Sequence, residues 1–255
     1  MCVLFVALNQ HPDYKLIVAA NRDEFFARPT QASGFWADSP ELLAGQDLQA
    51  GGTWMGLTTK GRFAALTNIR APKTMDKDKL SRGHLVSNYL KGNENIEATI
   101  QRLRQTRHQY NGYNLLFGDA DQLVAYNNFS DEYDVLKSDI YGLSNADIHT
   151  PWPKTLAGCE ELAHICQSQA PAEPALLALL HNTQQADDVH LPDTGIPKDW
   201  ERQLSARFIQ GQSYGTRSCT LLLVSQTSQV IWREQQYGPD SEFLGERRYE
   251  FQIAT

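Results

Sequence analysis

Short and almost wholly apolar runs alternate along this chain with turns rich in Asn, Gly, Pro and Asp. The first run covers Cys2–Leu8 and the second Leu16–Ala20, with turn-forming residues at 9–13 between them. Uninterrupted apolar runs of this length are typical of strands that are buried on both faces. We therefore predict a hairpin that opens at Cys2 and turns through a loop of about six residues.

The rest of the pattern predicts more hairpins and a set of helices. Strands are expected at 53–58 with 62–68, 113–118 with 122–127, 216–225 with 229–237, and singly at 140–143 and 248–253. Helices are expected at 82–90, 96–104, 154–167, 174–181 and 199–208. Asn93 or Asn95 is the candidate cap of the second helix. The polar stretch 184–198, which contains Pro and Gly, is expected to be a loop.

The order of these elements indicates the fold class. Strands joined directly by hairpins, with helices in separate blocks, are typical of antiparallel sheets with separate helical layers, which is an α+β fold. The chain has 255 residues, of which 41% are hydrophobic, so it is long enough for a large buried core. We expect a single domain over residues 1–255, although two smaller domains would also fit this length.

Charge and composition narrow the classes of partner. The formal net charge is -7, so no general positive field draws the chain onto nucleic acid or an anionic membrane. No apolar run approaches the roughly 20 residues that span a bilayer. The stretch from Met1 to Leu8 is too short for a signal peptide and has no basic residue before it. Four cysteines are sparse for a secreted scaffold, so we expect reduced thiols and a cytoplasmic location.

Cys2 is the first candidate for chemistry. Removal of Met1 would leave Cys2 with a free α-amine and a thiol, whose ordinary pKa values are about 8 and about 8.5. The amine of such a residue can accept the proton of its own nucleophile. The alternative is structural, because free cysteine is among the most buried residue types and packs as a small hydrophobe.

Four polar residues end the second predicted strand in the order Asn21, Arg22, Asp23, Glu24. Because side chains alternate along a strand, the two odd-numbered residues face one way and the two even-numbered residues the other. One pair is a candidate to line a site, and a carboxylate that faces Cys2 would orient its α-amine. The alternative is a solvated strand end with a surface ion pair of little energetic weight.

Three more polar residues lie in or just beyond predicted strands. Asn68 ends an apolar strand and carries an amide that can donate to a developing oxyanion, and Asn145 follows another strand. Ordinary turn asparagines are the alternative for both. Arg217 shares a strand face with Cys219 and Leu221, and a buried guanidinium requires a carboxylate, a ligand anion or hydrogen bonds. This arginine is the most informative single charge in the chain.

No metal or cofactor is expected. Cys159 and Cys166 lie on the buried side of one predicted helix, and His164 is displaced from them around it, so both cysteines are interpreted as core. Gly51 and Gly52 do not begin a phosphate loop, because no Gly-Lys-Ser/Thr follows them.

Several of these segments form an ordered set along the chain. They are Met1-Cys2, Asn21-Arg22-Asp23-Glu24, Gly51-Gly52-Thr53-Trp54, residues 61–68, Leu143-Ser144-Asn145, Thr150-Pro151-Trp152-Pro153-Lys154 and Thr216-Arg217-Ser218. The set resembles the transport and Golgi organisation protein 2 family, also called the NRDE family, from Met1 to about Val224. The resemblance implies an N-terminal nucleophile hydrolase-like fold, a four-layer αββα sandwich with two antiparallel sheets between helical layers. It also links the chain to secretion and Golgi organisation, to lipid and acyl-CoA metabolism and to intracellular haem movement.

The order of polar residues is also similar to that of cysteine N-terminal nucleophile amidases such as penicillin V acylase and bile salt hydrolase. This resemblance implies the catalytic set Cys2, Asp23, Asn68, Asn145 and Arg217. Substrate-binding roles are expected for Asn21, Arg22 and Trp54. One position departs from the amidase pattern, because Ala20 stands where those enzymes carry an arginine. The chain's own arginine here is Arg22. Because adjacent strand positions face opposite ways, we expect that Arg22 does not reach the thiol.

Two functional hypotheses follow. In the first, Cys2 attacks the carbonyl of an amide or thioester, its α-amine moves the proton, Asp23 holds that amine and the two asparagines stabilise the oxyanion or fix the substrate. Arg217 balances charge near the thiol.

In the second hypothesis the same scaffold binds or transfers a hydrophobic anion, such as haem or an acyl-CoA, in a cleft between the sheets. Arg217 or Arg22 would then meet a carboxylate or phosphate. Both hypotheses imply a small-molecule partner, without nucleic acid or membrane insertion, and the oligomeric state stays open. A purely structural role is a third reading, but it gives no reason for a charged arginine on an apolar strand face.

Overall fold

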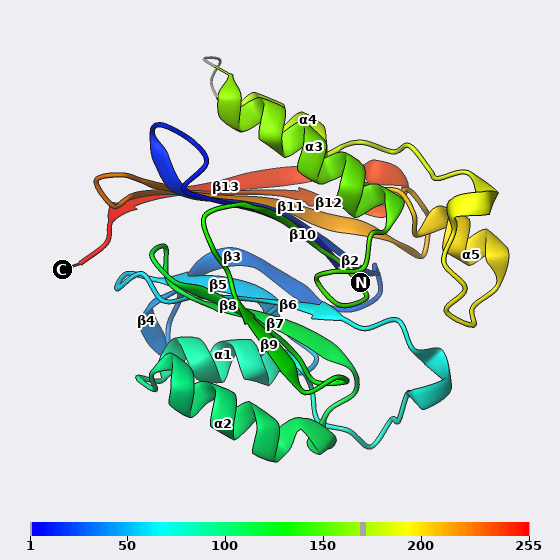
Figure 1. Ribbon diagram of the computed structural model, residues 1–255, viewed down its shortest axis with the longest axis horizontal. Coiled ribbons are helices and arrows are strands. Elements are labelled where there is room, and N and C mark those ends of the chain that lie inside the picture. Colours follow the sequence, from blue (N-terminus) through cyan, green and yellow to red (C-terminus); the bar gives the residue numbers. More distant parts are fainter. Residues whose placement is uncertain (1, 169–171, 255) are drawn as a thin grey trace.

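Two antiparallel sheets pack face to face in the computed structural model, which describes residues 2–168 and 172–254 (Figure 1). The first sheet contains β1 Cys2–Leu8, β2 Tyr14–Phe25, β10 Ile140–Leu143, β11 Tyr214–Ser225, β12 Gln229–Tyr237 and β13 Phe243–Gln252, in the order β10-β1-β2-β11-β12-β13. The second sheet contains β3 Thr30–Trp36, β4 Ser39–Asp47, β5 Met55–Thr58, β6 Phe63–Asn68, β7 Tyr113–Gly118, β8 Leu123–Asn127 and β9 Glu132–Val135, in sequence order.

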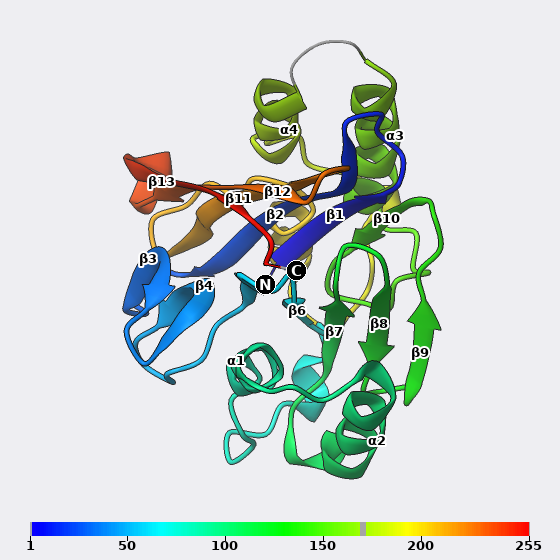
Figure 2. The ribbon, with the colours of Figure 1, turned by 90° about the vertical axis from the view of Figure 1, so that its left-hand side faces the viewer.

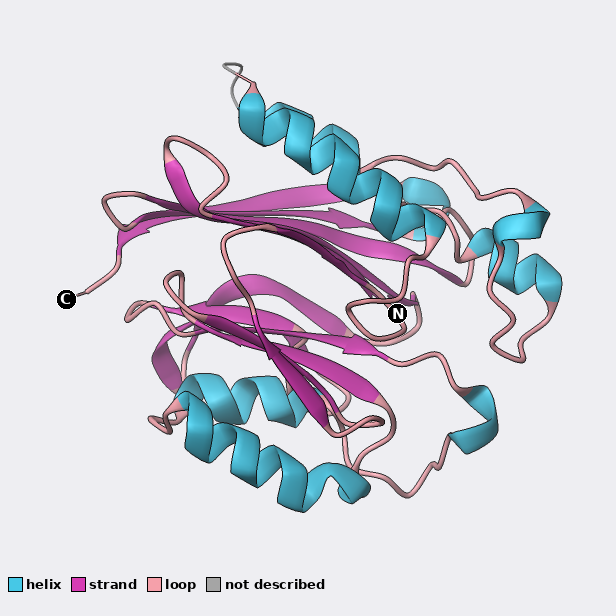
Figure 3. Ribbon diagram, viewed as in Figure 1, coloured by secondary structure: helices cyan, strands magenta, loops and turns pink. Residues whose placement is uncertain are grey.

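Helices form the two outer layers. They are α1 Gly83–Lys91, α2 Ile96–Thr106, α3 Pro153–Gln167, α4 Ala172–Leu180 and α5 Lys198–Gln203. Figure 2 shows α3 and α4 above the first sheet and α1 and α2 below the second, and Figure 3 shows the four layers by type of element. The α+β class and the αββα sandwich are therefore confirmed.

Strand β1 illustrates why this sequence requires four layers. All seven of its residues are buried. Its even-numbered side chains, such as Leu4 and Val6, belong to the core between the two sheets, and its odd-numbered ones, such as Val3 and Phe5, pack under α3 and α4. Because both faces are covered by apolar partners, the strand carries no polar alternation.

Helix α3 packs closely on β1. A Cβ atom at Gly158 would lie 2.1 Å from a ring atom of Phe5, so only glycine allows this approach. Helix α2 begins as expected, because the Asn95 side chain accepts a hydrogen bond of 2.8 Å from the backbone N–H of Ala98.

Three strands, the start of β13 and one helix end differ from expectation. Strand β13 begins at Phe243 rather than at residue 248. Strands β3, β4 and β9 were not predicted, because none of them is a continuous apolar run. β3 and β9 are edge strands with exposed or half-exposed residues, and the pairing of β3 with β4 contains two register shifts. The helix expected at 199–208 ends at Gln203. The following residues 204–209 are all buried, so they offer no single apolar face, and Phe208 donates its backbone N–H to Asn182 instead.

Strand β1 of the first sheet begins at the end of the molecule where α5 and the connection from β6 to α1 also lie (Figure 1). Within the described residues, none of the helices combines the length and the apolar composition required to cross a bilayer.

Candidate functional site

A cavity of about 410 Å³ lies at this end of the sandwich and has Cys2 in its wall. Arg22, Trp54 and Asn68 line it beside the cysteine, and the connection before α1 supplies the opposite wall through residues 75–77 and 79–83. Asp23 lines it as well, so four of the predicted site residues share this cavity with the candidate nucleophile.

Cys2 is 9% exposed and belongs to the core between the sheets. Its thiol is within hydrogen-bonding reach of the backbone N–H of Asp23, and its carbonyl accepts a hydrogen bond of 3.1 Å from Ser144 Oγ. Burial raises the pKa of the Cys2 thiol, the charge of Asp23 adds to this rise, and the charge of Arg22 opposes it. The thiol is therefore protonated at neutral pH until a base takes its proton.

Arg22 faces the thiol side of the sheet, which corrects the expectation that it does not reach Cys2. The two residues are direct partners in the β1–β2 register. The Arg22 guanidinium lies 4.3 Å from the centroid of the Trp54 ring and donates 3.2 Å to Thr30 Oγ1. Arg22 is 5% exposed and has no carboxylate within ion-pair distance among the described residues.

Asp23 is 1% exposed and pairs with Thr216 of β11, whose Oγ1 donates 2.7 Å to the Asp23 carboxylate. Burial raises the pKa of Asp23, while the positive charge of Lys154, the hydrogen bond from Thr216 and the charge of Arg70 oppose that rise. Asp23 also lines the cavity of Cys2. The orienting role of Asp23 stays a prediction.

The two predicted asparagines lie together but differ in what their side chains do. Asn145 is 1% exposed and its Nδ2 donates 2.9 Å to the Asn68 carbonyl, while its own Oδ1 accepts from Ser144 Oγ at 3.1 Å. The Asn68 side chain lines the cavity and makes no hydrogen bond within the described part of the chain. Asn68 is therefore available to a ligand, whereas Asn145 fixes the backbone that carries it.

Two predicted residues lie away from the cavity. A register shift between Thr216 and Ser218 takes Arg217 out of the strand pattern, so it does not share a buried face with Cys219 as expected. Its Nη1 instead donates to the carbonyls of Phe25 and Arg28.

Asn21 is the other residue away from the cavity. It is 1% exposed and its Nδ2 donates 2.8 Å to each of the carbonyls of Leu180 and Arg207. It belongs to the face of the sheet under α4 and does not line the cavity of Cys2, so its substrate-binding role stays a prediction.

Sequence reasoning missed a buried group of charged residues next to Cys2. Lys154, at the start of α3, is 5% exposed, and the ion pair of Arg70 with Glu201 has side chains that are 5% and 3% exposed. Burial lowers the pKa of Lys154 to about 8, partly offset by Asp23 and by Cys2. Lys154 follows Trp152 and Pro153, but only the packing of α3 turns its side chain inward.

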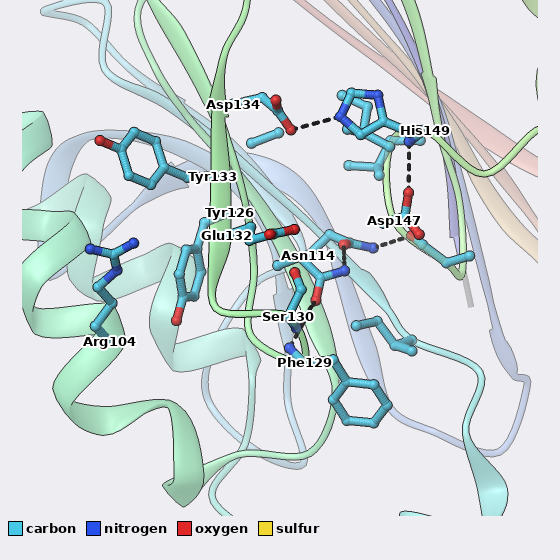
Figure 4. Close-up of a pocket in the computed structure, with 16 residues that line it drawn as sticks. Arg104, Asn114, Tyr126, Phe129, Ser130, Glu132, Tyr133, Asp134, Asp147 and His149 are labelled. Atoms are coloured by element: carbon cyan, nitrogen blue, oxygen red, sulfur yellow. Dashed lines mark hydrogen bonds and ion pairs between the residues drawn. The ribbon is translucent and has the colours of Figure 1, made fainter.

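A second and larger cavity, of about 660 Å³, lies between β7–β9 and residues 143–149 (Figure 4). Aromatic side chains at Phe129 and Tyr133 line it, and His149 Nε2 lies 3.0 Å from Asp134 Oδ2. Ser130 lies away from His149 in Figure 4, and no hydrogen bond joins them. We therefore assign the candidate site to the smaller cavity, which holds the thiol.

Metal-ligating side chains do not gather at either place. Across residues 2–168 and 172–254, no group of three or more His, Cys, Asp or Glu side chains is arranged to hold a metal ion.

Comparisons with known proteins agree with the sequence resemblance. The sequence profile of the family described as Transport and Golgi organisation 2 matches residues 1–239. The chain is 32% identical over 277 aligned positions to the Transport and Golgi organization 2 homolog of Mus musculus, and the alignment covers 100% of both chains. It is 28% identical over 262 positions to Transport and Golgi organization protein 2 of Drosophila melanogaster, covering 92% of each.

A solved structure is similar in fold. It is the Caenorhabditis elegans ortholog of N-acylethanolamine-hydrolyzing acid amidase, with a TM-score of 0.52, 12% sequence identity and coverage of 84% of this chain and 99% of that one. The likeness supports an N-terminal nucleophile hydrolase-like fold, and at this identity it concerns the fold alone.

Proposed function

The chain belongs to the Transport and Golgi organisation 2 family, and we propose that it is an N-terminal nucleophile hydrolase that cleaves an amide or thioester bond of a small acyl compound. The proposal requires removal of Met1, which makes Cys2 the first residue. The observation that carries it is that the Cys2 thiol shares a cavity wall with the unengaged side chain of Asn68, beside the buried carboxylate of Asp23.

Acylation begins with proton transfer from the Cys2 thiol to its own α-amine, which Asp23 orients. The sulfur then forms a bond to the substrate carbonyl carbon, and Asn68 Nδ2 donates to the oxyanion that develops. When the tetrahedral intermediate collapses, the bond from the carbonyl carbon to the leaving nitrogen or sulfur breaks. The leaving group takes the proton from the ammonium, and a thioester remains on Cys2.

Hydrolysis of that thioester completes the cycle. The α-amine accepts a proton from water, the water oxygen bonds to the acyl carbon, and the second tetrahedral intermediate releases the carboxylic acid. The thiol of Cys2 recovers its proton from the ammonium. Arg22, directly opposite on the next strand, favours the thiolate through its positive charge.

The amide class of substrate has support from the fold comparison. The Caenorhabditis elegans protein of the same fold is named for the hydrolysis of N-acylethanolamines, which are amides. Thioesters are included because the same attack by sulfur on a carbonyl cleaves them.

Intact mass followed by acyl-enzyme trapping tests the proposal. Purified protein should lack Met1, and brief incubation with an activated acyl amide or acyl thioester should add one acyl group. Cys2→Ala should abolish the adduct, whereas Cys159→Ser should leave it unchanged, because Cys159 is a free cysteine outside the cavity. Retention of Met1, or an adduct that survives Cys2→Ala, rules out this mechanism.

One observation favours a second candidate function, the binding or transfer of a hydrophobic anion such as haem or an acyl-CoA. Arg22 is 5% exposed, lines the cavity and forms no direct ion pair among the described residues, while its charge acts at longer range on the buried carboxylate of Glu234. A buried guanidinium without a direct ion pair favours an anionic ligand. Its stacking on Trp54 adds an apolar surface beside the charge.

Titration with haem and with an acyl-CoA distinguishes this candidate from the hydrolase. Saturable binding that Arg22→Met weakens and Cys2→Ala preserves would favour the binding role. The absence of saturable binding to either compound would remove it. We also propose a cytoplasmic location for the protein, because all four cysteines are free, as suits a reducing compartment.

A further inference from the structure

Charged side chains of both signs line the cavity that holds Cys2. Its wall carries the cations Arg22, Arg28, Lys77, Lys79 and Arg82 and the carboxylates Asp23, Glu24, Asp47 and Asp76. Some of these charges already have partners. Arg28 forms ion pairs with Asp47 at 2.6 Å and with Glu24 at 4.0 Å. Arg22 and Arg82 are the two arginines of this wall that form no ion pair within the described residues.

Arg82 is the residue immediately before α1, and it lies half-buried in the cavity wall. Its Nη1 donates 2.9 Å to the carbonyl of Gly112, and the same carbonyl accepts a hydrogen bond of 3.0 Å from the backbone N–H of Ile69. Ile69 directly follows Asn68, the proposed oxyanion donor. The guanidinium of Arg82 is therefore tied through one carbonyl group to the segment that carries Asn68.

The segment that carries Arg82 is fixed to the connection between α2 and β7. The Asn111 side chain accepts 2.9 Å from the backbone N–H of Asp76 and donates 2.7 Å to the carbonyl of the same residue. The backbone N–H of Leu80 donates 2.9 Å to the carbonyl of Gln109. Because these bonds hold the segment at several points, the position of Arg82 is set before a ligand binds, which lowers the entropic cost of binding.

Both guanidinium groups have hydrogen-bonding capacity left. A guanidinium presents several N–H donors in a planar fork. Among the described residues, Arg82 donates to Gly112 alone and Arg22 to Thr30 Oγ1 alone. The charges of Glu24 and Cys2 act on Arg82 from beyond ion-pair distance. The remaining donors favour a carboxylate or a phosphate, because these groups accept paired hydrogen bonds from a guanidinium.

We propose that the substrate of the Cys2 site carries a carboxylate or phosphate group close to its scissile bond, and that Arg82 selects for this group. The inference rests on the proposed function, which supplies the amide or thioester bond. The anionic group has to lie close to that bond because one carbonyl joins Arg82 to the segment of Asn68. The cavity of about 410 Å³ is at the small end of ligand pockets, so the substrate class is compact anionic amides and thioesters.

Neutral amides of the same size should bind less well. A neutral amide that fills the cavity offers Arg82 an uncharged acceptor, and hydrogen bonds between an ionised donor and an ionised acceptor are stronger than those to a neutral one. Donors that a ligand covers without pairing also lose their water, which costs free energy. The wall should therefore discriminate between an anionic amide and a neutral one of equal length.

Calorimetric titration of the Cys2→Ala variant tests this preference, because that variant binds probes without turnover. N-hexanoylglycine carries a carboxylate on the amine side of its amide, N-hexylsuccinamic acid carries one on the acyl side, and N-hexanoyl-O-phosphoethanolamine carries a phosphate. N-hexanoylethanolamine is the neutral reference. At least one anionic probe should bind about tenfold more tightly than the reference. The probe that binds most tightly identifies the anionic group and the side on which it lies.

Variants at Arg82 separate its charge from the rest of the cavity. Arg82→Met should reduce the affinity of the preferred anionic probe to that of the neutral one, whose own affinity should not change. Arg62→Met is the matched control and should leave all affinities unchanged, because Arg62 is half-buried and donates to the carbonyls of Tyr89 and Glu94 outside this cavity. If Arg82→Met does not fold, Arg82→Lys serves instead, and the preference should fall because an ammonium lacks the planar fork of donors.

Anionic probes that bind no more tightly than the neutral one, or do not bind at all, overturn the inference. A preference that is undiminished in the Arg82 variant overturns it as well. The outcome is independent of hydrolysis. A charge preference in a protein that forms no acyl-enzyme would support the inference and count against the hydrolase. An acyl-enzyme that forms equally well from neutral and anionic probes would have the opposite meaning.

Discussion

Cys2 and Arg22 are direct partners across the β1–β2 pair, so the thiol and the guanidinium project from the same face of the first sheet. Ala20, which stands where the cysteine amidases that the sequence resembles carry an arginine, pairs with Leu4 two residues further along that face. The chain therefore supplies a cation on the thiol's face from Arg22, and the alanine at position 20 does not leave the thiol without one.

Replacement of Arg22 tests this relationship. Arg22→Met should raise the pKa of the Cys2 thiol, because the positive charge that opposes the effect of burial is lost. Alkylation of Cys2 by iodoacetamide at pH 7.5, followed by intact mass, should slow by about tenfold, which is one pKa unit. Arg22→Lys keeps the charge and should retain most of the rate. Equal rates in the parent protein and Arg22→Met would mean that the guanidinium does not act on the thiol.

The face that Arg22 occupies illustrates what the sequence lacked. Alternation correctly separates Arg22 from Asp23, but which of them faces the thiol depends on the register between β1 and β2. Strand β1 is buried on both faces, so its apolar pattern does not specify that register. The prediction that Arg217 shares a buried strand face with Cys219 was wrong for a different reason. The shift in register after Thr216 interrupts the alternation on which that prediction rested.

The fold was more predictable than the site because apolar runs and turn residues are local signals. Strands with such runs, as in β6 and β7, were expected within a residue or two of their bounds. Edge strands such as β9 lack such a run, since solvent covers part of them. The buried charge of Lys154 depends on α3, β2 and the segment around Leu204 coming together, which no local pattern records.

Asn68 should matter for catalysis and not for stability. Its side chain lines the cavity without a hydrogen-bond partner in the described residues, so Asn68→Ala should change the free energy of unfolding by less than about 0.5 kcal/mol. Loss of an oxyanion donor should lower the acylation rate of Cys2 by about 10²–10³-fold. Urea denaturation and the rate of adduct formation measure the two effects. An undiminished acylation rate would contradict the oxyanion role.

Asn145, in contrast, should matter for the stability of the fold. Its Nδ2 donates 2.9 Å to the Asn68 carbonyl, and its own carbonyl accepts 2.8 Å from the backbone N–H of Arg70. Asn145→Ala removes the first bond and leaves a polar group without its partner, so the free energy of unfolding should fall by about 1–3 kcal/mol. Asn68→Ala is the matched control for urea denaturation. A loss in Asn145→Ala no larger than in that control would show that the bond contributes little.

Gly158 tests the contact between α3 and β1. Alanine is favoured over glycine inside a helix by about 1 kcal/mol, which by itself predicts stabilisation. A Cβ at this position would lie 2.1 Å and 2.3 Å from two ring atoms of Phe5, and relief of such overlap typically costs about 1–3 kcal/mol. Gly158→Ala should therefore destabilise the protein in urea denaturation. The loss should be smaller when the substitution is made on a Phe5→Leu background, and an equal loss on both backgrounds would point to another cause.

Lys154 should make stability depend on pH in a defined window. Its pKa is lowered to about 8 in the folded protein from its ordinary value of 10.5, so between these values the unfolded chain binds more protons than the folded one. The free energy of unfolding contributed by this group therefore rises with pH across the window, by up to about 3 kcal/mol, and the full penalty for burying the charge applies below about pH 8.

The difference in stability between the parent protein and Lys154→Met isolates this contribution, because the cysteine and tyrosine titrations are present in both. Urea denaturation at intervals from pH 7 to pH 10.5 should show that difference moving in favour of the parent protein. The same comparison with Lys15→Met should show no such rise, since that lysine pairs with Asp121 at the surface. A flat or falling difference for Lys154→Met would mean that the lysine is not held as a buried cation.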